Sequence, residues 1–187
     1  MLSQEQACIS ALNTLIESQP IQSNHLDCYH HLALQIQHNL QYQHDWTNLC
    51  IHTISPVSHQ PLSRPLISGL APHRIYVHPD DQIEELQKGV KDGDIEVERE
   101  WVLPTNLKEK WSLRKFAEIF DSIGEAPPKP LDETKNSVDH DDEKGLTEKM
   151  ISQKRRGGKR VLLATISDDS TVVYYVVHDG IVKPRQN

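Results

Sequence analysis

Five cationic side chains lie within seven residues, in the segment Lys154-Arg-Arg-Gly-Gly-Lys-Arg160. Lysine and arginine at this density can contact RNA phosphates, and they can also serve as a nuclear import signal. A third interpretation is a solvated hinge that balances the acidic run Asp132 to Glu143. The whole chain carries a formal charge of −7, which argues against bulk coating of nucleic acid, so any RNA contact would be a local patch. Its candidate residues are Lys154, Arg155, Arg156, Lys159 and Arg160.

Two adjacent carboxylates, Asp168 and Asp169, stand in the segment Ser167 to Ser170 between two apolar stretches. Short oxygen-bearing side chains cap backbone amides where a chain reverses, so a hairpin turn is the simplest interpretation. A carboxylate pair at an exposed tip can also enter a cationic groove of another protein, where charge-assisted hydrogen bonds favour one partner over others. The pattern alone leaves both interpretations open.

Cysteine and histidine residues do not form a recognisable metal-binding pattern. The candidate ligands are Cys28, His31, Cys50 and His52. Structural zinc requires four ligands at tetrahedral geometry, and the sequence contains neither a C-x-x-C pair nor a phosphate-binding glycine loop. We therefore predict no metal and no other cofactor. A two-histidine ribonuclease mechanism, such as His59 with His73 or His78, is chemically possible, but no spacing selects those residues.

Apolar periodicity predicts an α+β fold in which a mixed, largely antiparallel sheet packs against two main helices. The predicted strands lie near residues 46–54, 74–78, 95–103, 160–167 and 171–177. Residues 55–72 are rich in proline and serine and are predicted to be a loop, with a strand at Leu66-Ile67 as an alternative.

Helical spacing places apolar residues on one face of each main helix. In the first helix, residues 25–41 behind the cap Asn24, that face comprises Leu26, Tyr29, Ala33, Ile36 and Leu40. In the second helix, residues 112–123 with Ser112 as its cap, it comprises Leu113, Phe116, Ala117, Phe120 and Ile123. A shorter helix is predicted to begin at the cap Asp80 and to end before Gly89.

The C-terminal region predicts a β-meander. Residues 161–166 are apolar on both alternating sets, which is typical of a strand covered on both faces. Thr171 to Val177 are all β-branched or aromatic, as strands favour. Asp179-Gly180 then predicts a hairpin into a last short strand at Ile181-Val182.

An uncharged strand at a sheet edge must be covered, either by the chain's own helices or by a partner. Tyr174 and Tyr175 are predicted to point to opposite faces of their strand. One of the two can therefore join the core while the other meets a partner, because tyrosine is enriched at interfaces.

Length and composition suit one domain, residues 21–187, preceded by a tail or marginal helix at residues 1–20. Residues 125–158 contain several prolines and an acidic run, which predict a flexible insertion. No apolar run approaches about 18 residues, and the N-terminus lacks the basic start of a secretory signal. Three cysteines without paired spacing favour reduced thiols. We therefore expect a soluble, intracellular protein.

Residues 168–184, Asp-Asp-Ser-Thr-Val-Val-Tyr-Tyr-Val-Val-His-Asp-Gly-Ile-Val-Lys-Pro, resemble the C-terminal end of the tRNA-splicing endonuclease family, also called the tRNA intron endonuclease family. Within that family the chain is most similar to the smallest, structural subunit of the eukaryotic heterotetramer, the Sen-fifteen type. Residues 101–107 and 75–79 support the resemblance, which extends over most of the chain.

The resemblance implies a metal-independent RNA-cleaving site that this chain does not complete. Catalytic family members use a tyrosine to deprotonate the 2′-hydroxyl, a histidine to protonate the leaving 5′-oxygen and a lysine to steady the charged phosphate. Lys159, with Lys154 as a second candidate, stands near the family's lysine. The upstream window for the other two groups contains no tyrosine and only His140, within the acidic insertion. We therefore predict no catalytic residue and no enzyme activity for this chain by itself.

By the same resemblance, the chain would be a non-catalytic structural subunit that supports intron excision from pre-tRNA by docking a catalytic subunit within a heterotetramer. In such assemblies an acidic turn enters a basic groove of a catalytic subunit, and C-terminal strands of two subunits pair edge to edge. The predicted interface residues are Asp168, Asp169, Thr171, Val173, Tyr174, Tyr175, Val177, Ile181 and Val182.

Two other functions stay open at this point. One is a stand-alone, homodimeric interaction adaptor, and the other is a self-sufficient metal-independent RNA endonuclease. Homodimerisation of the isolated chain is compatible with the subunit role, because a strand without its proper partner pairs with a copy of itself. We expect a nuclear location, with a cytoplasmic one at the mitochondrial surface as the alternative. Pre-tRNA would be contacted indirectly or through the local basic patch.

Overall fold

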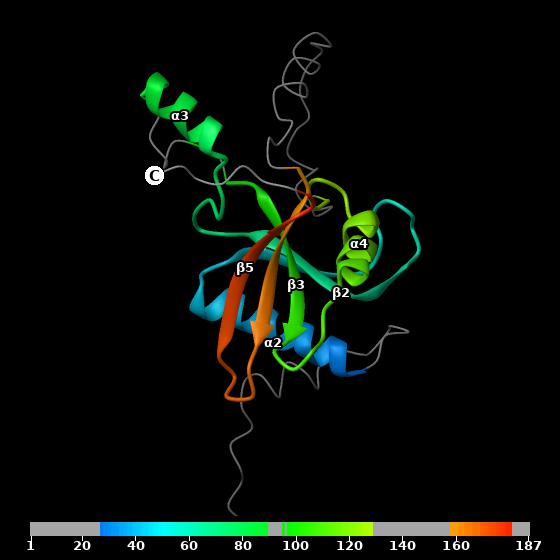
Figure 1. Cartoon of the computed structure of the whole chain (residues 1–187). Helices are drawn as coiled ribbons and strands as arrows, with labels where there is room; N and C mark the ends of the chain where they lie inside the picture. Colours follow the sequence, from blue (N-terminus) through cyan, green and yellow to red (C-terminus); the bar gives the residue numbers. More distant parts are fainter. Residues whose placement is uncertain (1–26, 90–94, 96, 129–157, 181–187) are drawn as a thin grey trace, which may run out of the picture.

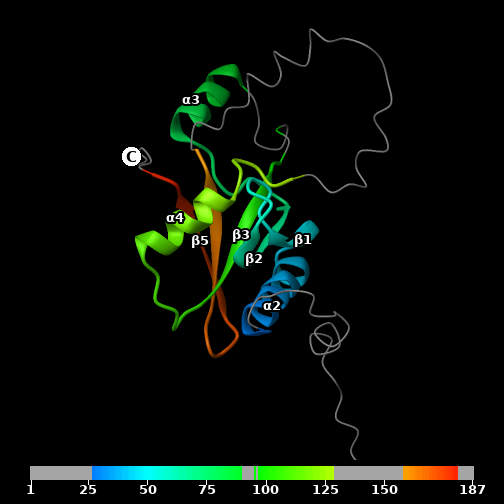
Figure 2. The same cartoon turned by 90° about the vertical axis from the view of Figure 1, so that its right-hand side faces the viewer.

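A five-stranded sheet carries one helix on each of its faces (Figures 1 and 2). The computed structural model describes residues 27–89, 95, 97–128 and 158–180. The strands are β1 (Thr47–Ile54), β2 (Pro61–Leu70), β3 (Arg99–Asn106), β4 (Arg160–Ile166) and β5 (Val172–His178). The helices are α2 (Asp27–Gln43), α3 (Pro79–Lys88) and α4 (Leu113–Ser122). Figure 2 shows α4 on one side of the sheet and α2 on the other.

The strands lie across the sheet in the order β1-β2-β3-β4-β5. Three neighbouring pairs are antiparallel, and β3 pairs with β4 in parallel. Parallel neighbours require a long crossover, and the connection from β3 to β4 includes α4. The predicted α+β class and the mixed, largely antiparallel sheet are therefore confirmed.

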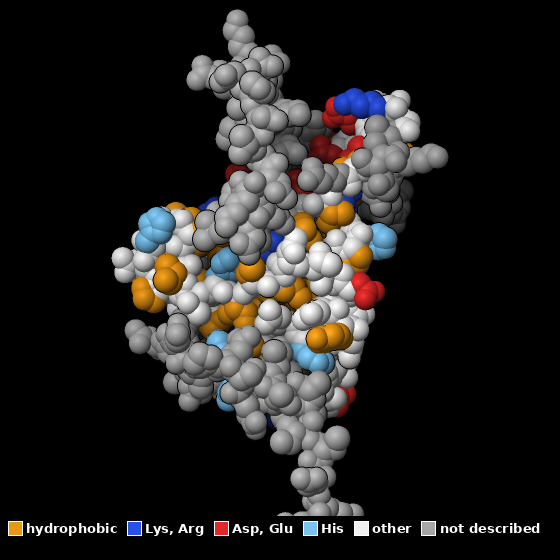
Figure 3. All heavy atoms as spheres, turned by 180° about the vertical axis from the view of Figure 1, so that it is seen from behind, with side chains coloured by type: hydrophobic (Ala, Val, Ile, Leu, Met, Phe, Trp, Pro, Cys, Tyr) orange, Lys and Arg blue, Asp and Glu red, His pale blue; other side chains and the backbone are white. Residues whose placement is uncertain are grey.

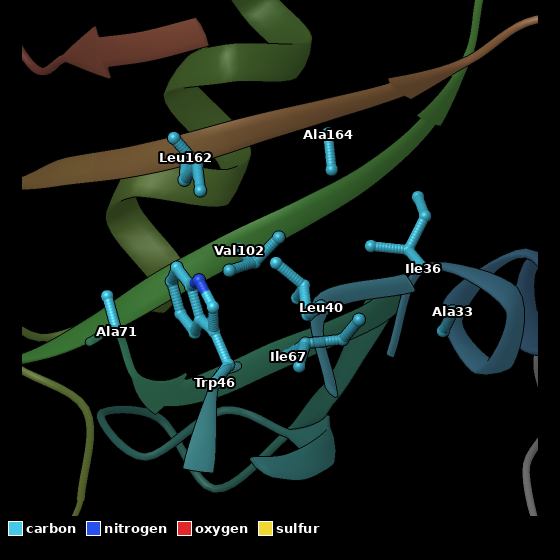
Figure 4. Packing of buried hydrophobic residues seen from close by; sticks show 9 residues of the cluster. All are labelled: Ala33, Ile36, Leu40, Trp46, Ile67, Ala71, Val102, Leu162 and Ala164. Carbon is cyan, nitrogen blue, oxygen red and sulfur yellow. The ribbon is translucent and has the colours of Figure 1, made fainter. Parts of the chain in front are cut away.

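On one face of the sheet, α2 contributes the apolar stripe that its sequence predicts. Ala33, Ile36 and Leu40 are buried and belong to one cluster with side chains of β2, β3 and β4 (Figure 4). Trp46, which follows the helix in the sequence, belongs to the same cluster, and its backbone N–H donates to the carbonyl of Leu40 at 3.0 Å. A fully buried aliphatic side chain contributes about 2 kcal/mol relative to an exposed one, so the stripe fixes α2 on the sheet. The start of the stripe, Leu26 with its cap, lies outside the described residues.

On the other face, α4 packs through a different set of side chains from the predicted one. Ser112 caps the helix as predicted, and its hydroxyl accepts from the backbone N–H of Lys115 at 3.3 Å. Ile119 and Phe120 are buried in a cluster with residues of β2, β3 and β4, whereas Leu113 is 88% exposed. The assignment of Leu113 and Ala117 to the core face is wrong, because the helix is rotated toward Ile119 and leaves both residues exposed.

Strand β2 lies where the sequence predicts mainly a loop, so the loop prediction is wrong, whereas the alternative of a strand at Leu66-Ile67 is confirmed. The strand has ten residues, and the segment 64–69 is buried. Pro61 is its first residue, and Pro65 lies beside a register shift against β1 and before the stretch paired with β3, which begins at Ile67. Proline is tolerated at such places because no ladder hydrogen bond is lost. Gly69 leaves room for the Leu49 side chain, because an added Cβ would lie 2.6 Å from Leu49 Cδ2 and would force that side chain to shift.

The strand predicted at residues 74–78 is also wrong, because these residues form an extended connection that pairs with no described strand. Ile75 packs on the α2-side cluster. The ring of Tyr76 lies 4.5 Å from the ring of His178 and 5.6 Å from the guanidinium carbon of Arg160. Side-chain packing, rather than a backbone ladder, therefore accounts for the apolar alternation in this segment.

The short helix α3 follows this connection, as predicted, but its cap is a different residue. His78 is the N-cap, and its Nδ1 accepts from the backbone N–H of Asp80 at 3.2 Å, with Pro79 at the first helical position. Proline is favoured there because its missing N–H would have no partner inside the helix. Gly89 ends the helix in the left-handed region at φ 67°, as predicted.

Strand β3 begins and ends later than the predicted 95–103. Pro104 lies beyond the stretch of β3 that pairs with β2, so its missing N–H interrupts no ladder on that side. The predicted tail at residues 1–20, nearly all of the insertion at 125–158 and the strand at Ile181-Val182 lie outside the described residues. Within the described ranges, no helix has the length and apolar character needed to cross a membrane.

A buried ion pair joins the first residue of β4 to β3. The Arg160 guanidinium donates to both carboxylate oxygens of Glu100, through Nε to Oε2 at 3.0 Å and through Nη2 to Oε1. Its Nη2 also lies 3.5 Å from Glu98 Oε2. Arg160 and Glu100 are both buried. Removing one member of such a pair leaves an uncompensated buried charge, which is strongly destabilising.

We predict that Arg160→Ala lowers the free energy of unfolding by roughly 3–5 kcal/mol. Lys88→Ala is the matched control, because it removes an exposed ion pair between Lys88 Nζ and Glu84, and such pairs contribute about 0.5 kcal/mol. Urea unfolding followed by circular dichroism measures both variants. Equal effects of the two substitutions would contradict the structural role of the Arg160 pair.

Candidate functional site

The β5 edge of the sheet is regular, and it is not paired by any described strand. β5 pairs with β4 in one continuous register from Arg160↔His178 to Ile166↔Val172. No described strand lies on its other side. The opposite edge, β1, is irregular: its register against β2 shifts twice, and Asn48 adopts a left-handed backbone at φ 51°. Bulges and irregular backbone are common ways of blocking a sheet edge, so β5 is the edge that can accept another strand.

The two faces of β5 have different roles, as the neighbouring tyrosines predict. The Tyr174 hydroxyl donates to Asn39 Oδ1 of α2 at 2.5 Å, and burial raises the pKa of that hydroxyl well above its ordinary value. Tyr175 is 58% exposed and Val173 is 45% exposed on the opposite face. One face of β5 is thus tied to the core, whereas the other presents apolar surface to solvent.

The turn between β4 and β5 carries the acidic pair at its exposed tip. The backbone N–H of Thr171 donates to Asp169 Oδ1 at 3.0 Å and holds the pKa of that carboxyl below its ordinary value. Asp168 Oδ2 lies 2.5 Å from Lys108 Nζ, with both side chains largely exposed. Ser170 adopts φ 66°, as a tight reversal requires. The hairpin is confirmed, and both carboxylates stand on the surface with contacts inside this chain.

Two of the predicted RNA-contacting residues have structural partners. Lys159 Nζ donates to the carbonyl of Phe120 in α4 at 2.8 Å, where the free carbonyls of a helix end favour a cation. Arg160 forms the buried pair with Glu100 described above. The segment 154–156 lies outside the described residues, as does His140. The two described residues of the basic segment, Lys159 and Arg160, therefore both bond to other parts of this chain.

The histidine and cysteine candidates also have local roles. His52 Nε2 lies 2.8 Å from Ser68 Oγ, and burial, with a further contribution from Arg99, lowers the pKa of its imidazole to about 4. Its ring lies 4.9 Å from the ring of Trp101. Cys28 and Cys50 are free thiols. Among the described residues, no three side chains of the metal-binding types are grouped to hold an ion.

A small cavity of about 120 Å³ lies between α4 and β2. Polar side chains that line it, those of Arg64 and Glu109, bind other residues of this chain. The Arg64 guanidinium donates to both carboxylate oxygens of Glu109 at 3.1 and 3.0 Å. It also lies over the rings of Tyr29 and Trp111, at 4.3 and 4.9 Å from their centroids. Ligand pockets usually occupy about 300 Å³ or more. This stack therefore holds the loop before α4 against the sheet rather than forming a substrate site.

Two residues at the edge were not found by sequence reasoning. Asn39 lies on the side of α2 that faces Tyr174, and Lys108 lies beside Asp168. Lys108 reaches the turn because Asn106 pairs with Ile166 in the parallel register of β3 and β4. No local pattern reveals this proximity, since it depends on a pairing between distant segments.

An open strand edge with an exposed apolar face and an acidic tip is typical of a protein that joins a larger assembly by adding its sheet to another chain. Comparison of the sequence with known proteins assigns the family. The model of the family described as Sen15 protein matches residues 35–133 and 128–187. The chain belongs to this family, and the resemblance predicted from residues 168–184 is confirmed.

The relatives carry consistent names. Over 190 residues the chain is 42% identical to the probable tRNA-splicing endonuclease subunit tsp-1 of Neurospora crassa, a match that covers 98% of this chain and 74% of that protein. It is 24% identical over 176 residues to the probable tRNA-splicing endonuclease subunit sen15 of Schizosaccharomyces pombe, covering 94% and 96%. A 40-residue stretch is 52% identical to the tRNA-splicing endonuclease subunit SEN15 of Eremothecium gossypii, covering 21% and 34%.

Proposed function

We propose that this chain is a non-catalytic structural subunit of a tRNA-splicing endonuclease and that it docks a catalytic subunit through β5 and the acidic turn before it. The names of its relatives support the subunit role. The observation that supports the docking surface is the uninterrupted register of β5 at an edge that no described strand covers. A partner strand added there would gain backbone hydrogen bonds along the whole length of β5.

The exposed face of β5 supports the same surface. Val173 and Tyr175 leave apolar area in solvent, and an uncovered, uncharged strand of this kind is an aggregation hazard unless a partner covers it. Tyr174 faces the core and acts through its bond to Asn39, so it holds the strand rather than meeting the partner. Ile181 and Val182, also predicted as interface residues, lie outside the described residues.

The exposed carboxylates of the turn before β5 would help this chain to select its partner. Asp168 and Asp169 are exposed and can exchange their present contacts for cations of a basic groove. Lys108 is the internal competitor, because its ammonium group already lies against Asp168. Exposed ion pairs are weak, so a groove with several cations would displace it. Complementary charge of this kind sets orientation and association rate more than affinity.

We further propose that this subunit contributes no catalytic group and acts in the nucleus within a heterotetramer. The absence of a tyrosine in the window before β4, where catalytic family members would carry one, supports the first point. The basic segment 154–160 supports nuclear import, and contact with pre-tRNA rests on Lys154, Arg155 and Arg156. Lys159 and Arg160 contribute to the fold through Phe120 and Glu100.

The acidic-tip proposal predicts that Asp168→Lys with Asp169→Lys lowers recovery of the catalytic subunit by about ten-fold when the tagged chain is purified from its cells. The matched control is Glu118→Lys with Asp121→Lys on α4, which also reverses two exposed charges and is expected to change recovery less than about two-fold. Asp168→Asn with Asp169→Asn preserves the acceptor for Thr171 and separates charge from turn geometry. Undiminished recovery with both lysines present would refute the role of the tip.

The alternative of a self-sufficient nuclease predicts that the purified chain cuts intron-containing pre-tRNA by itself. We expect no cleavage under conditions in which the purified endonuclease complex cuts the same RNA to completion. Gel analysis of the RNA measures this directly, and product formation by the chain alone would favour the nuclease.

A further inference from the structure

The outer face of α3 is an apolar surface that no described part of the chain covers. The helix buries none of its residues. Ile83 is 55% exposed and Leu86 is 71% exposed, and residues three apart lie on the same side of a helix. Figures 1 and 2 both show α3 standing beyond the end of the sheet at which β4 begins. A helix with such a face normally packs it against apolar side chains of the same protein or of a partner.

The charge on α3 defines what kind of surface it can pack against. Its ten residues carry four carboxylates, on Asp80, Asp81, Glu84 and Glu85, and one ammonium group, on Lys88. In Figure 3 acidic side chains gather at the end of the molecule formed by this helix. The complementary surface combines apolar side chains with lysine or arginine, because positive potential opposite this helix is attractive and negative potential is not.

Contacts with the preceding connection fix the position of α3, although none of the helix's own residues is buried. Arg74 donates to both carboxylate oxygens of Glu85 at 2.7 and 2.9 Å, which ties the helix to the connection that precedes it. That connection packs on β5 through the rings of Tyr76 and His178, 4.5 Å apart. A ten-residue helix is marginal in isolation, so these contacts set its orientation. The connection that carries α3 is thus held beside His178, the last residue of β5.

This placement makes the α3 face continuous with the proposed docking edge. A strand that pairs with β5 along its whole length must pass His178, and His178 contacts Tyr76, two residues before the N-cap of α3. The partner chain would therefore reach α3 directly after leaving the sheet edge. Two adjoining contacts on one partner bind more tightly than either alone, because the second forms at a high effective concentration.

We propose that α3 is a second docking surface for the partner that pairs with β5 and that it receives a basic segment of that partner with apolar residues between its cations. This inference rests on the proposed function. Ile83 and Leu86 contact the apolar side chains of the segment. The carboxylates of α3 face its lysine and arginine residues and fix the direction in which the segment lies.

The test uses the full-length tagged chain, purified from its cells together with the endonuclease subunits. Ile83→Ser with Leu86→Ser is expected to lower recovery of those subunits about five- to ten-fold. The matched control, Val57→Ser with Leu113→Ser, removes two exposed apolar side chains elsewhere and is expected to change recovery less than about two-fold. The variant Val173→Lys with Tyr175→Lys tests docking through β5 separately from docking through α3. Circular dichroism confirms that each variant is folded, as expected for substitutions at exposed positions.

Carbodiimide crosslinking of the wild-type complex identifies what lies on α3, because it joins carboxylates directly to amines. We expect links from Asp80, Asp81 or Glu84 to lysines of an endonuclease subunit. Links only to lysines of this chain or of a second copy would overturn the proposal, as would full recovery with Ile83→Ser and Leu86→Ser. If the β5 variant loses the partner while the α3 variant keeps it, the inference about α3 fails and the proposed function stands. If the β5 variant also keeps the partner, both fail.

Discussion

The parallel pairing of β3 with β4 sets the position of every feature of the candidate site. It holds Val102 against Leu162 and continues to Asn106 against Ile166. β4 is therefore an interior strand, apolar on both faces, and β5 is placed at the edge of the sheet. The same register brings Lys108 beside the turn that carries Asp168. The buried pair of Arg160 with Glu100 fixes the other end of β4, the strand with which β5 pairs along its whole length.

The two edges of the sheet differ in the regularity of their strand pairing, and the proposed docking role rests on this difference. β1 is broken by register shifts and a left-handed residue, which prevents a further strand from pairing along it. β5 has neither feature, and it leaves Val173 and Tyr175 exposed on the side of the sheet that carries α4. A monomer that had no partner would be expected to block both edges. An edge that no described strand covers is what the proposed docking role requires.

Local patterns in the sequence were sufficient for the elements whose side chains follow one simple periodicity. The α2 stripe and the β4–β5 hairpin were predicted because apolar residues alternate or recur there without interruption. Only Leu66-Ile67 of β2 stood as a possible strand, because the prolines and serines around it resemble a loop. The irregular pairing with β1 explains why Pro65 is tolerated. Residues 74–78 have the apolar alternation of a strand because side-chain packing on β5 produces the same pattern as a ladder.

The candidate site was predictable in part. The acidic turn and the opposite orientations of Tyr174 and Tyr175 follow from residue type and strand geometry. Lys108 and Asn39 could not be found, because their contacts depend on which distant segments pair in the sheet. Lys159 and Arg160 appear in the sequence as part of a charged run, yet a helix end and a buried carboxylate are their partners. Charge density in a sequence does not distinguish a binding patch from an internal ion pair.

Hydrogen exchange of the backbone amides tests most directly whether β5 is the docking edge. The measurement compares the chain alone with the chain in the purified endonuclease complex, region by region. The account predicts that amides of Val172–His178 exchange at least about ten-fold more slowly in the complex, while those of β1 are unchanged. Unchanged exchange along β5, with protection appearing at β1 instead, would contradict it.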